Sequence, residues 1–300
     1  MKRIVVVGSL NMDTVIETSH MPKCGETVAG KNVVQIPGGK GANQAYAAGK
    51  LGGNVTMIGA VGRDSSGAAL LESLKSVGVD VSRIKEMEHT TTGQAFITVD
   101  DQGDNSIIII SGANGKVTTD LIDQNKDIIR GSDIVILQLE IPLEVVQYAK
   151  ELAVKEKKTV IVDPAPAVKG IPDIFWEGID YIKPNETELE ILTGMTTKSE
   201  EATIKAAKSL LEKGVKNILV TLGGAGCMHV SEEGNRFYKA NKVKAVDTTA
   251  AGDCFTAAFA LALSQGKNCS DAIEFGQKAS AIAVTRKGAQ TSTPTEEEMR

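Results

Sequence analysis

Short apolar runs alternate along this chain with longer segments of helical periodicity. The runs are rich in aliphatic and β-branched residues and cover 4–7, 55–60, 134–139, 159–162 and 218–221. Such runs are typical of strands that are buried on both faces of a parallel sheet. The helical segments fall between them, at 65–77, 121–129, 143–155 and 199–212. This alternation predicts an α/β fold with a mostly parallel central sheet and helices on both faces.

A second pattern consists of short runs with partly alternating polarity. They occur at 14–18 and 27–34, and again at 94–99 and 106–110 on either side of a polar turn at 100–105. We interpret them as antiparallel strands of a small sheet. This sheet would be a lid, built from segments near 13–36 and 93–111, on a single domain that spans 1–300. Its apolar faces would need covering by a ligand or by a second copy of the chain.

Composition narrows the possible partners and compartments. The 300 residues are 42% hydrophobic, enough for a full core, and the net charge is −5 with no basic stripe. Neither nucleic acid nor an anionic membrane is therefore an expected partner, and no apolar run approaches the length of a membrane span. The first strand is too short for a signal peptide. Four cysteines without a C-x-x-C pair suggest reduced thiols. We expect a soluble, cytoplasmic protein.

Polar side chains follow several predicted strands. Asn11 and Asp13 come after 4–7, Glu140 after 134–139 and Asp163 after 159–162. Ligands of open α/β sheets bind at the carboxyl ends of the strands. For Asn11 and Asp13, a plain polar turn is the alternative.

The segment 37–45 is rich in glycine and leads into a helix. Two glycines precede Lys40, a third follows it, and Asn43 comes shortly after. The spacing is not that of a Walker loop. A turn that merely begins a helix is the alternative, but the density of glycines and donors favours contact with a small ligand.

Two further segments carry polar or glycine residues after strands. Asn185 and Glu188 are three residues apart, so one helical turn would place both on one face, where their oxygens suit hydrated Mg²⁺. A capping box explains the same pair equally well. The glycine-rich run from Thr221 to Gly226 would let the backbone approach a nucleotide, although such runs are also common turns.

The stretch 246–255 combines two carboxylates, Asp247 and Asp253, with the small residues Ala250, Ala251 and Gly252. Unpaired amides at a helix start form a site for an anion. A carboxylate in the first turn would then suit a base that deprotonates a hydroxyl attacking a phosphate. An ordinary capped helix with an acidic first turn is the alternative. Near the end of the chain, a helix over 279–284 leads into a second glycine-bearing loop, 285–292, which would close over the same pocket.

Taken together, these motifs resemble the ribokinase family of carbohydrate kinases, the PfkB group, over nearly the whole chain. The resemblance is carried by segments 8–13, 37–44, 138–140, 183–188, 247–253 and 285–290. It implies a Rossmann-like sandwich with a β lid that also forms a homodimer clasp. It further implies ATP-dependent phosphorylation of a sugar, with D-ribose converted to ribose 5-phosphate.

The resemblance also implies roles for individual residues. Asp253 looks like the base, and the amides of Ala250, Ala251, Gly252 and Asp253 would form the anion hole. The sugar would contact Asn11, Asp13, Gly39, Lys40, Gly41, Ala42, Asn43, Glu140 and Asp253. ATP would contact Asn185, Thr221, Leu222, Gly223, Gly224, Ala225, Gly226, Gly252, Asp253 and Gln277.

Two metal ions are implied in the same way. Asn185 and Glu188 would order Mg²⁺ through water. K⁺ would be held by Asp247, Thr249, Ala283, Arg286, Gly288 and Ser292, several of them through backbone carbonyls. The sequence departs from the family pattern at its end, because it stops soon after Glu298. A last helix would be short or missing, which affects packing near the cation loop.

Two alternatives stay open at this stage. Another sugar or nucleoside kinase of the same family, such as a fructokinase, a deoxyribokinase or an adenosine kinase-like enzyme, would share these motifs. Aromatic residues make up only 4% of the chain, which weighs against nucleosides. A catalytically silent sugar-binding regulator would not need Asp253 beside an anion hole.

Overall fold

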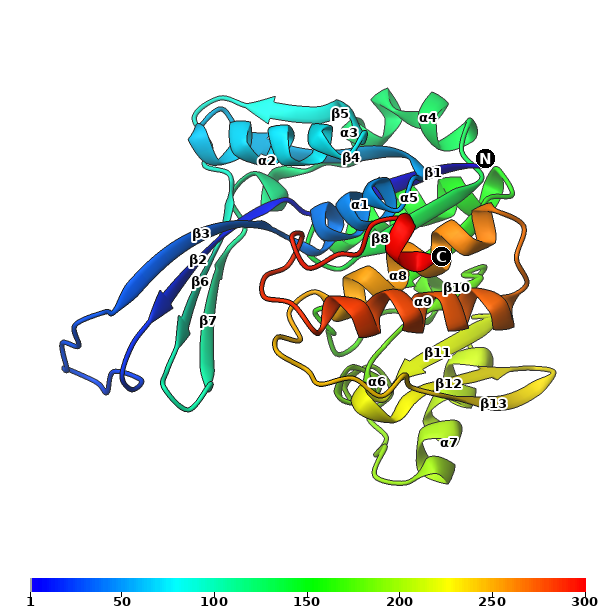
Figure 1. The fold of residues 1–300 in the computed structure, drawn as a ribbon. Helices are drawn as coiled ribbons and strands as arrows, with labels where there is room; N and C mark the ends of the chain where they lie inside the picture. Colours follow the sequence, from blue (N-terminus) through cyan, green and yellow to red (C-terminus); the bar gives the residue numbers. More distant parts are fainter. Residues whose placement is uncertain (1) are drawn as a thin grey trace.

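The computed structural model describes residues 2–300, and these residues form two β-sheets of different size (Figure 1). The larger sheet has nine strands among the described residues, in the order β13-β12-β11-β10-β9-β8-β1-β4-β5. All neighbouring pairs are parallel except β11 with β12 and β12 with β13. In chain order the strands are β1 (Arg3–Val7), β4 (Asn54–Gly62), β5 (Asp80–Met87), β8 (Ile134–Gln138), β9 (Thr159–Asp163), β10 (Tyr181–Ile182), β11 (Asn217–Thr221), β12 (Gly226–Ser231) and β13 (Gly234–Lys239). The predicted mostly parallel sheet is confirmed.

Helices cover both faces of this sheet (Figure 1). Successive residues of β1 point to opposite faces, so Ile4 and Val6 pack in one hydrophobic cluster and Val5 and Val7 in the other. The first cluster is covered by α1 (Lys40–Lys50), α2 (Ser65–Ser76), α8 (Ala251–Ser264) and α9 (Cys269–Ala283). The second is covered by α3 (Thr119–Gln124), α4 (Lys126–Arg130), α5 (Leu143–Lys155), α6 (Glu186–Thr193) and α7 (Glu200–Leu211).

The structure corrects several predicted elements of this domain. The helix expected over 121–129 is two short helices, α3 and α4, separated at Asn125, whose side-chain amide donates to the Leu121 carbonyl. The segment 279–284 is only the end of the longer helix α9. Strands β5 and β13 were not predicted, because their polar, partly exposed residues lack a clear apolar run. The acidic end of the chain forms a single 3-10 turn, Glu297–Met299.

The smaller sheet projects from the main domain (Figure 1). It consists of β2 (Asn11–Glu17), β3 (Asn32–Gly38), β6 (Gly93–Val99) and β7 (Asn105–Ile110), in the order β3-β2-β6-β7. The prediction that its strands are all antiparallel is wrong, since β2 and β6 pair in parallel. Strand β3 also begins later than expected and runs on into the glycine segment. Asn11 and Asp13, for which a plain polar turn was the alternative, lie at the start of β2.

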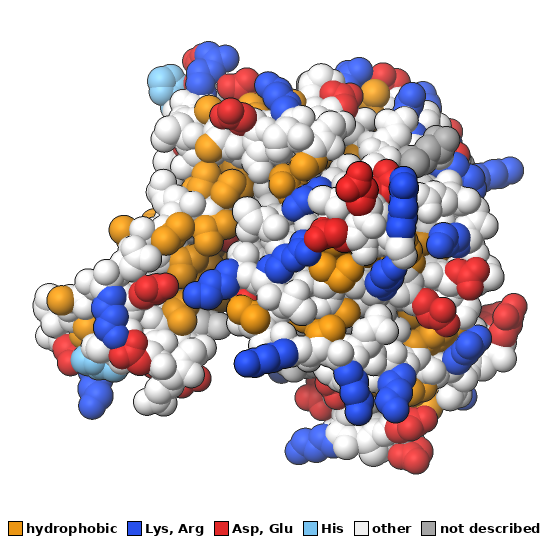
Figure 2. All heavy atoms as spheres, in the orientation of Figure 1, with side chains coloured by type: hydrophobic (Ala, Val, Ile, Leu, Met, Phe, Trp, Pro, Cys, Tyr) orange, Lys and Arg blue, Asp and Glu red, His pale blue; other side chains and the backbone are white. Residues whose placement is uncertain are grey.

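Both faces of the smaller sheet expose apolar side chains. Every residue of β7 is exposed, and Ile107 to Ile110 are each about half to two-thirds exposed, as are Val33 and Val34 on β3. Figure 2 shows hydrophobic side chains gathered where this sheet leaves the main domain. Within residues 2–300, no helix combines the length and apolar character that crossing a bilayer requires.

Candidate active site

Helix α8 begins at a strained turn that leaves its first amides uncapped. Ala250 precedes the helix with φ of 56°, a left-handed conformation that alanine rarely adopts and that costs about 1 kcal/mol or more. No described side chain caps this end. The Ala251 amide donates to the Thr248 carbonyl at 3.2 Å, whereas Gly252 and Asp253 present their amides at the helix start. This geometry suits an anion.

Asp253 lies in the first turn of α8, and its side chain is buried. Its Oδ2 accepts a hydrogen bond from the Asn43 side-chain amide at 3.0 Å, and its Oδ1 accepts one from Gln44 at the same distance. Burial raises the pKa of Asp253, and Asp163 adds to this, while Lys40 and the two amides oppose it. A carboxylate with a raised pKa beside an anion-binding turn is a suitable proton acceptor.

A buried ion pair lies beside Asp253. Lys183 Nζ is 3.2 Å from Asp163 Oδ2, and both side chains are at most 6% exposed. The same Asp163 oxygen accepts a hydrogen bond from Gln44 at 2.9 Å. Lys183 Nζ also stands 3.0 Å from the position that a Cβ on Gly252 would occupy, so it reaches the turn at the start of α8.

The glycine segment 38–41 fits closely against the start of β2. Gly39 precedes α1 with φ of 86°, and a Cβ there would come within 2.6 Å of the Asn11 amide nitrogen. A Cβ on Gly41 would meet the Ser9 amide at the same distance. These glycines therefore let α1 approach β2, which brings Asn43 to Asp253. Ala42 is fully buried in the core.

The predicted sugar-contacting side chains gather around Asp13. Burial, together with the neighbouring carboxylates Glu140 and Asp253, raises the pKa of Asp13 to about 7. Burial alone would lower the pKa of Lys40, but Asp253, Asp163 and Glu140 outweigh it and raise that pKa. Lys40 therefore stays protonated among the carboxylates.

Two of these side chains are already held by protein partners. The Asn114 side-chain amide donates to Asn11 Oδ1 at 2.7 Å, which fixes the orientation of Asn11. Glu140 Oε2 accepts from the Lys40 backbone amide at 3.0 Å and from the Ser9 hydroxyl at 2.5 Å. Asn43 Oδ1, in contrast, is buried without a hydrogen-bond partner among the described residues, so it has an acceptor available for a hydroxyl.

A cavity of about 760 Å³ opens next to the start of α8. Its lining includes Lys40 and Asp253 on one side, and predicted nucleotide-contacting residues on the other. Those nucleotide positions are Asn185, Thr221, Gly223, Gly224, Gly226, Gly252 and Gln277. Leu222 and Ala225, also predicted to contact ATP, are not part of the lining. A Cβ on Gly223 or Gly224 would meet no protein atom within 4 Å, so these glycines face open space.

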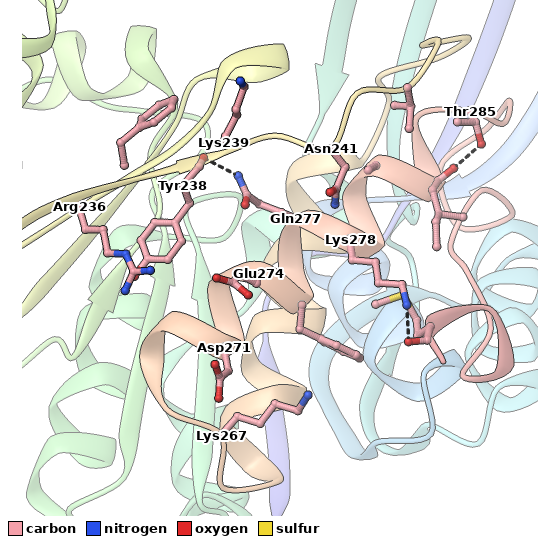
Figure 3. Close-up of a pocket in the computed structure, with 16 residues that line it drawn as sticks. Arg236, Tyr238, Lys239, Asn241, Lys267, Asp271, Glu274, Gln277, Lys278 and Thr285 are labelled. Carbon is pink, nitrogen blue, oxygen red and sulfur yellow. Dashed lines mark hydrogen bonds between the residues drawn. The ribbon is translucent and has the colours of Figure 1, made fainter.

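Gln277 on α9 stands between this cavity and a second one of about 960 Å³. Figure 3 shows the second cavity, with Gln277 turned toward β13, where its amide donates to the Tyr238 carbonyl at 2.9 Å. Two of the lysines that line this cavity have other partners: Lys278 Nζ donates to the Met299 carbonyl, and Lys267 lies over the Phe275 ring. The carboxylates in the lining of this cavity, Asp271 and Glu274, are exposed, whereas Asp163 and Asp253 in the lining of the first are buried.

Asn185 and Glu188 form a capping box at the start of α6. The Glu188 amide donates to Asn185 Oδ1, and the Asn185 amide donates to Glu188 Oε2, both at 2.8 Å. The capping-box interpretation is confirmed. Both residues also line the 760 Å³ cavity. Their oxygens are the type of donor that hydrated Mg²⁺ prefers, so the pair also fits that ion.

Asp247 joins the loop before α8 to the loop after α9. Its Oδ1 accepts from the Thr249 amide and hydroxyl, and its Oδ2 accepts from the Gly288 amide at 2.9 Å. Burial would raise the pKa of Asp247, but these hydrogen bonds outweigh burial and lower it.

The other residues predicted to hold K⁺ lie in the same two loops. Arg286 pairs with Glu298, and the Arg286 amide donates to the Ala283 carbonyl. Ser292 is buried and donates to the Ala289 carbonyl. The segments expected to hold K⁺ are thus adjacent and rich in oxygen donors, which fits an alkali cation.

Comparison with known proteins identifies the family. The model of the pfkB family carbohydrate kinases matches residues 1–296. The chain belongs to the pfkB family of carbohydrate kinases. Similar proteins include a ribokinase from Haemophilus influenzae, 43% identical over 99% of this chain and 97% of that protein. A deoxyribokinase from Salmonella typhi is 37% identical over 98% and 96% of the two chains.

Solved structures agree with this assignment to the carbohydrate kinases. A ribokinase from Thermotoga maritima superposes with a TM-score of 0.92 at 41% identity, covering 100% of this chain and 98% of that one. An Arabidopsis thaliana ribokinase complexed with ribose and ATP superposes with a TM-score of 0.93 at 35% identity, covering 99% and 97%.

Three residues near Asp253 in this carbohydrate kinase were given no role in the site from the sequence. Asp163 was noted only as a polar residue after an apolar run, and it ends β9, while Lys183 follows β10, so their position at the carboxyl ends was a usable signal. Gln44 carries no such signal, because only the packing of α1 against α8 brings its amide to Asp253. Side-chain pairing across 209 residues of sequence separation cannot be read from local spacing.

Proposed function

We propose that this carbohydrate kinase transfers the γ-phosphoryl group of ATP to the 5-hydroxyl of D-ribose. The observation that carries the proposal is the position of Asp253, a buried carboxylate at an uncapped helix start between two groups of candidate ligand-binding side chains. On one side are the hydroxyl-binding candidates around Asp13, and on the other is the 760 Å³ cavity. The similarity to proteins named ribokinase, one of them solved with ribose and ATP, supports ribose as the acceptor.

The proposed chemistry needs one proton transfer and one in-line displacement. Asp253 takes the proton from the sugar 5-hydroxyl as the oxygen attacks the γ-phosphorus. A new O–P bond forms, the bond from phosphorus to the β–γ bridging oxygen breaks, and ADP leaves. Amides at the start of α8 stabilise the charge on the transferred group, as phosphoryl transfer requires. Lys40, held protonated by its carboxylate neighbours, adds positive charge nearby.

Sugar recognition follows from the acceptors and donors around the glycine segment. Asp13, Asn43 and Glu140 each offer side-chain oxygens to hydroxyl groups, and the Lys40 amide holds Glu140 because the glycines on either side of Lys40 permit a close approach. Asn11 is oriented by Asn114. A site of this type should strongly reject an analogue that lacks a hydroxyl, because a buried polar group would lose its partner.

Two metal ions complete the proposal. Mg²⁺ would be ordered through water by Asn185 and Glu188, and would neutralise charge on the phosphate oxygens. K⁺ would be held by the loops that Asp247 joins, directly behind the start of α8. The role of this chain's residues there is to keep the two loops together, which holds the α8 amides in place.

Replacing Asp253 tests the proposal most directly. Asp253→Asn should abolish ADP release, by on the order of 10³-fold or more, because the amide cannot accept the proton. Ribose binding measured by calorimetry should stay within a few-fold of the parent value. Near-normal phosphorylation by this variant would contradict the assignment of Asp253 as the base.

A substrate panel tests the acceptor. An ADP-release assay across ribose, deoxyribose, fructose, tagatose 6-phosphate and adenosine should give the highest kcat/KM for ribose. A higher value for deoxyribose would instead favour the deoxyribokinase activity for which its Salmonella typhi relative is named.

Replacing the cation tests the proposed K⁺ site. Exchange of K⁺ for Na⁺ or Li⁺ should lower activity, whereas activity that does not depend on the cation would contradict the role given to the two loops that Asp247 joins.

Assembly and compartment belong to the same proposal. The exposed apolar residues of β3 and β7 would be covered by a second copy, so that the small sheet is both a lid over the sugar and a homodimer clasp. A cytoplasmic location fits the cysteines, all four of which are described and are free thiols.

A further inference from the structure

Gln44 has no role in the chemistry proposed above, yet it is completely buried at the centre of the site. It lies on α1, one residue after the predicted sugar contact Asn43. Its side-chain nitrogen is within hydrogen-bond distance of two carboxylates, Asp253 Oδ1 at 3.0 Å and Asp163 Oδ2 at 2.9 Å. An amide nitrogen has two hydrogens, so it can donate one to each.

We propose that Gln44 is a positioning residue that fixes the Asp253 carboxylate and links it to the Asp163–Lys183 ion pair. In this arrangement the Gln44 amide stabilises the charged form of Asp253, whereas the negative charge of Asp163 disfavours it. The inference rests on the proposed role of Asp253 as the base, and deepens it by naming what orients that base.

The orientation of the Gln44 amide is itself determined by a neighbour. Gln138, at the end of β8, donates from its side-chain nitrogen to Gln44 Oε1 at 2.6 Å. That bond assigns the oxygen of Gln44 to Gln138 and turns its nitrogen toward the two carboxylates. Both glutamines are fully buried, so water does not compete for these bonds.

Gln138 is in turn held by the approach of β1. A Cβ on Gly8 would lie 1.8 Å from Gln138 Oε1, so the glutamine fits only because position 8 is glycine. The chain of contacts therefore runs from Gly8 through Gln138 and Gln44 to Asp253. The hydrogen bonds of the two buried glutamines restrict where the Asp253 carboxylate can lie, as a pre-organised base requires.

The Asp163–Lys183 ion pair affects the pKa of Asp253 in the direction opposite to Gln44. Asp163 is a second buried negative charge next to Asp253, and its charge raises the pKa of Asp253. Lys183 compensates that charge at 3.2 Å, and Asp163 Oδ1 has no partner among the described residues. Gln44, by donating to Asp253, lowers the pKa of the base. Removing the Gln44 amide should therefore raise the pKa of Asp253, and removing the charge of Asp163 should lower it.

Besides Asp163, the titratable groups that face Asp253 from the surrounding elements are Asp13 on β2, Lys40 on α1, Lys183 after β10 and the neutral thiol of Cys254 on α8. Neither substitution changes these side chains, although Asp163→Asn leaves Lys183 without its carboxylate partner, which also favours a lower pKa of Asp253. The pH dependence of kcat at saturating sugar and MgATP is the appropriate measurement, since it reports groups in the bound enzyme.

The decisive experiment compares Gln44→Met with Asp163→Asn in the full-length enzyme. Gln44→Met keeps the volume of the side chain but removes both donors, so the acid limb of the kcat profile should move to higher pH. Near neutral pH, kcat should fall by on the order of 10- to 100-fold, while KM for sugar and for MgATP changes little. Asp163→Asn removes a negative charge, so the acid limb should move to lower pH.

A matched control removes a buried amide elsewhere. Asn125 is buried between α3 and α4 and donates to the Leu121 carbonyl. Asn125→Leu should lower the thermal midpoint without moving the acid limb. If Gln44→Met does not fold, Gln138→Met takes its place, because it removes the donor that orients the Gln44 amide and should move the acid limb in the same direction, to higher pH.

The outcomes separate this inference from the proposed function. Acid limbs that move in opposite directions support the positioning role. Acid limbs that stay in place, or that both move the same way, overturn it even if Asp253→Asn is inactive. An active Asp253→Asn variant would instead remove the proposed function on which the inference rests.

Discussion

Two runs of almost the same residues have opposite environments in this protein. Ile134 to Leu137 on β8 and Ile107 to Ile110 on β7 are both aliphatic and uninterrupted. Ile136 is fully buried, whereas Ile108 is 66% exposed. The first run lies inside the nine-stranded sheet between two helical layers, and the second forms the edge of the projecting sheet (Figure 1). An apolar run therefore indicates that a strand needs covering, but not what covers it.

The two sheets differ in whether their apolar faces are covered by elements of the same chain. The large sheet obtains its cover from helices of the same chain, and its stability is set on folding. The small sheet leaves an apolar surface that a single chain does not cover, which is the property expected of an interface. Asp13, proposed to bind the sugar, lies on the small sheet, while Asp253, the proposed base, lies at the start of a helix on the large one. The proposed sugar binding therefore involves a sheet with an uncovered apolar surface, and the proposed chemistry involves a sheet that helices cover.

The largest predicted effect is a difference in stability between matched substitutions in the two runs. Ile136→Ala should lower the free energy of unfolding by about 2–5 kcal/mol, because it leaves a cavity in a closed core. Ile108→Ala should change it by less than about 1 kcal/mol in dilute solution, since its side chain is already exposed. Urea unfolding monitored by circular dichroism measures both.

The dependence of these two effects on protein concentration tests whether a second copy covers the small sheet. If a second copy covers β7, the effect of Ile108→Ala should grow with concentration, whereas that of Ile136→Ala should not. Ultracentrifugation should show a weaker dimer for Ile108→Ala. A parent protein that stays monomeric at all concentrations would contradict the dimer clasp.

Much of the main sheet could be predicted from the sequence because each strand carries its own signal. The run 4–7 is continuous and β-branched, as a doubly covered parallel strand must be. Polar residues after such runs also predicted which side chains would lie near Asp253 at the carboxyl ends of the strands. The pairing of β2 with β6 could not be predicted, since no local pattern distinguishes a parallel from an antiparallel partner 82 residues away.

The remaining features of the site depend on contacts between distant segments. Ala250 has a positive φ without being glycine, and nothing in its type indicates this strain. The double contact of Gln44 arises from the packing of α1 on α8. The strands β5 and β13 are held by their neighbours in the sheet and not by apolar runs of their own.

The next effect concerns the lid side of the site. The pKa of Asp13 is raised to about 7, so this carboxylate, which is proposed to accept sugar hydroxyls, is progressively protonated as pH falls through that value. Below it, KM for ribose should rise by about tenfold per pH unit. Asp13→Asn should weaken binding at neutral pH and remove this dependence. A parent KM that stays flat through pH 7 would show that Asp13 does not hold the sugar as a carboxylate.

The smallest predicted effect concerns a residue of the main domain that has both a structural and a proposed ligand role. Asn185→Ala should destabilise the fold by about 1 kcal/mol, because the helix α6 loses its cap. Asn185→Ser should restore the cap, since a serine hydroxyl accepts the same amide hydrogen bond. If Asn185 also orders the metal–nucleotide complex, KM for MgATP should stay raised in both variants. A serine variant that recovers both stability and KM would leave Asn185 with the capping role alone, and nucleotide binding would then depend on the other residues of the cavity.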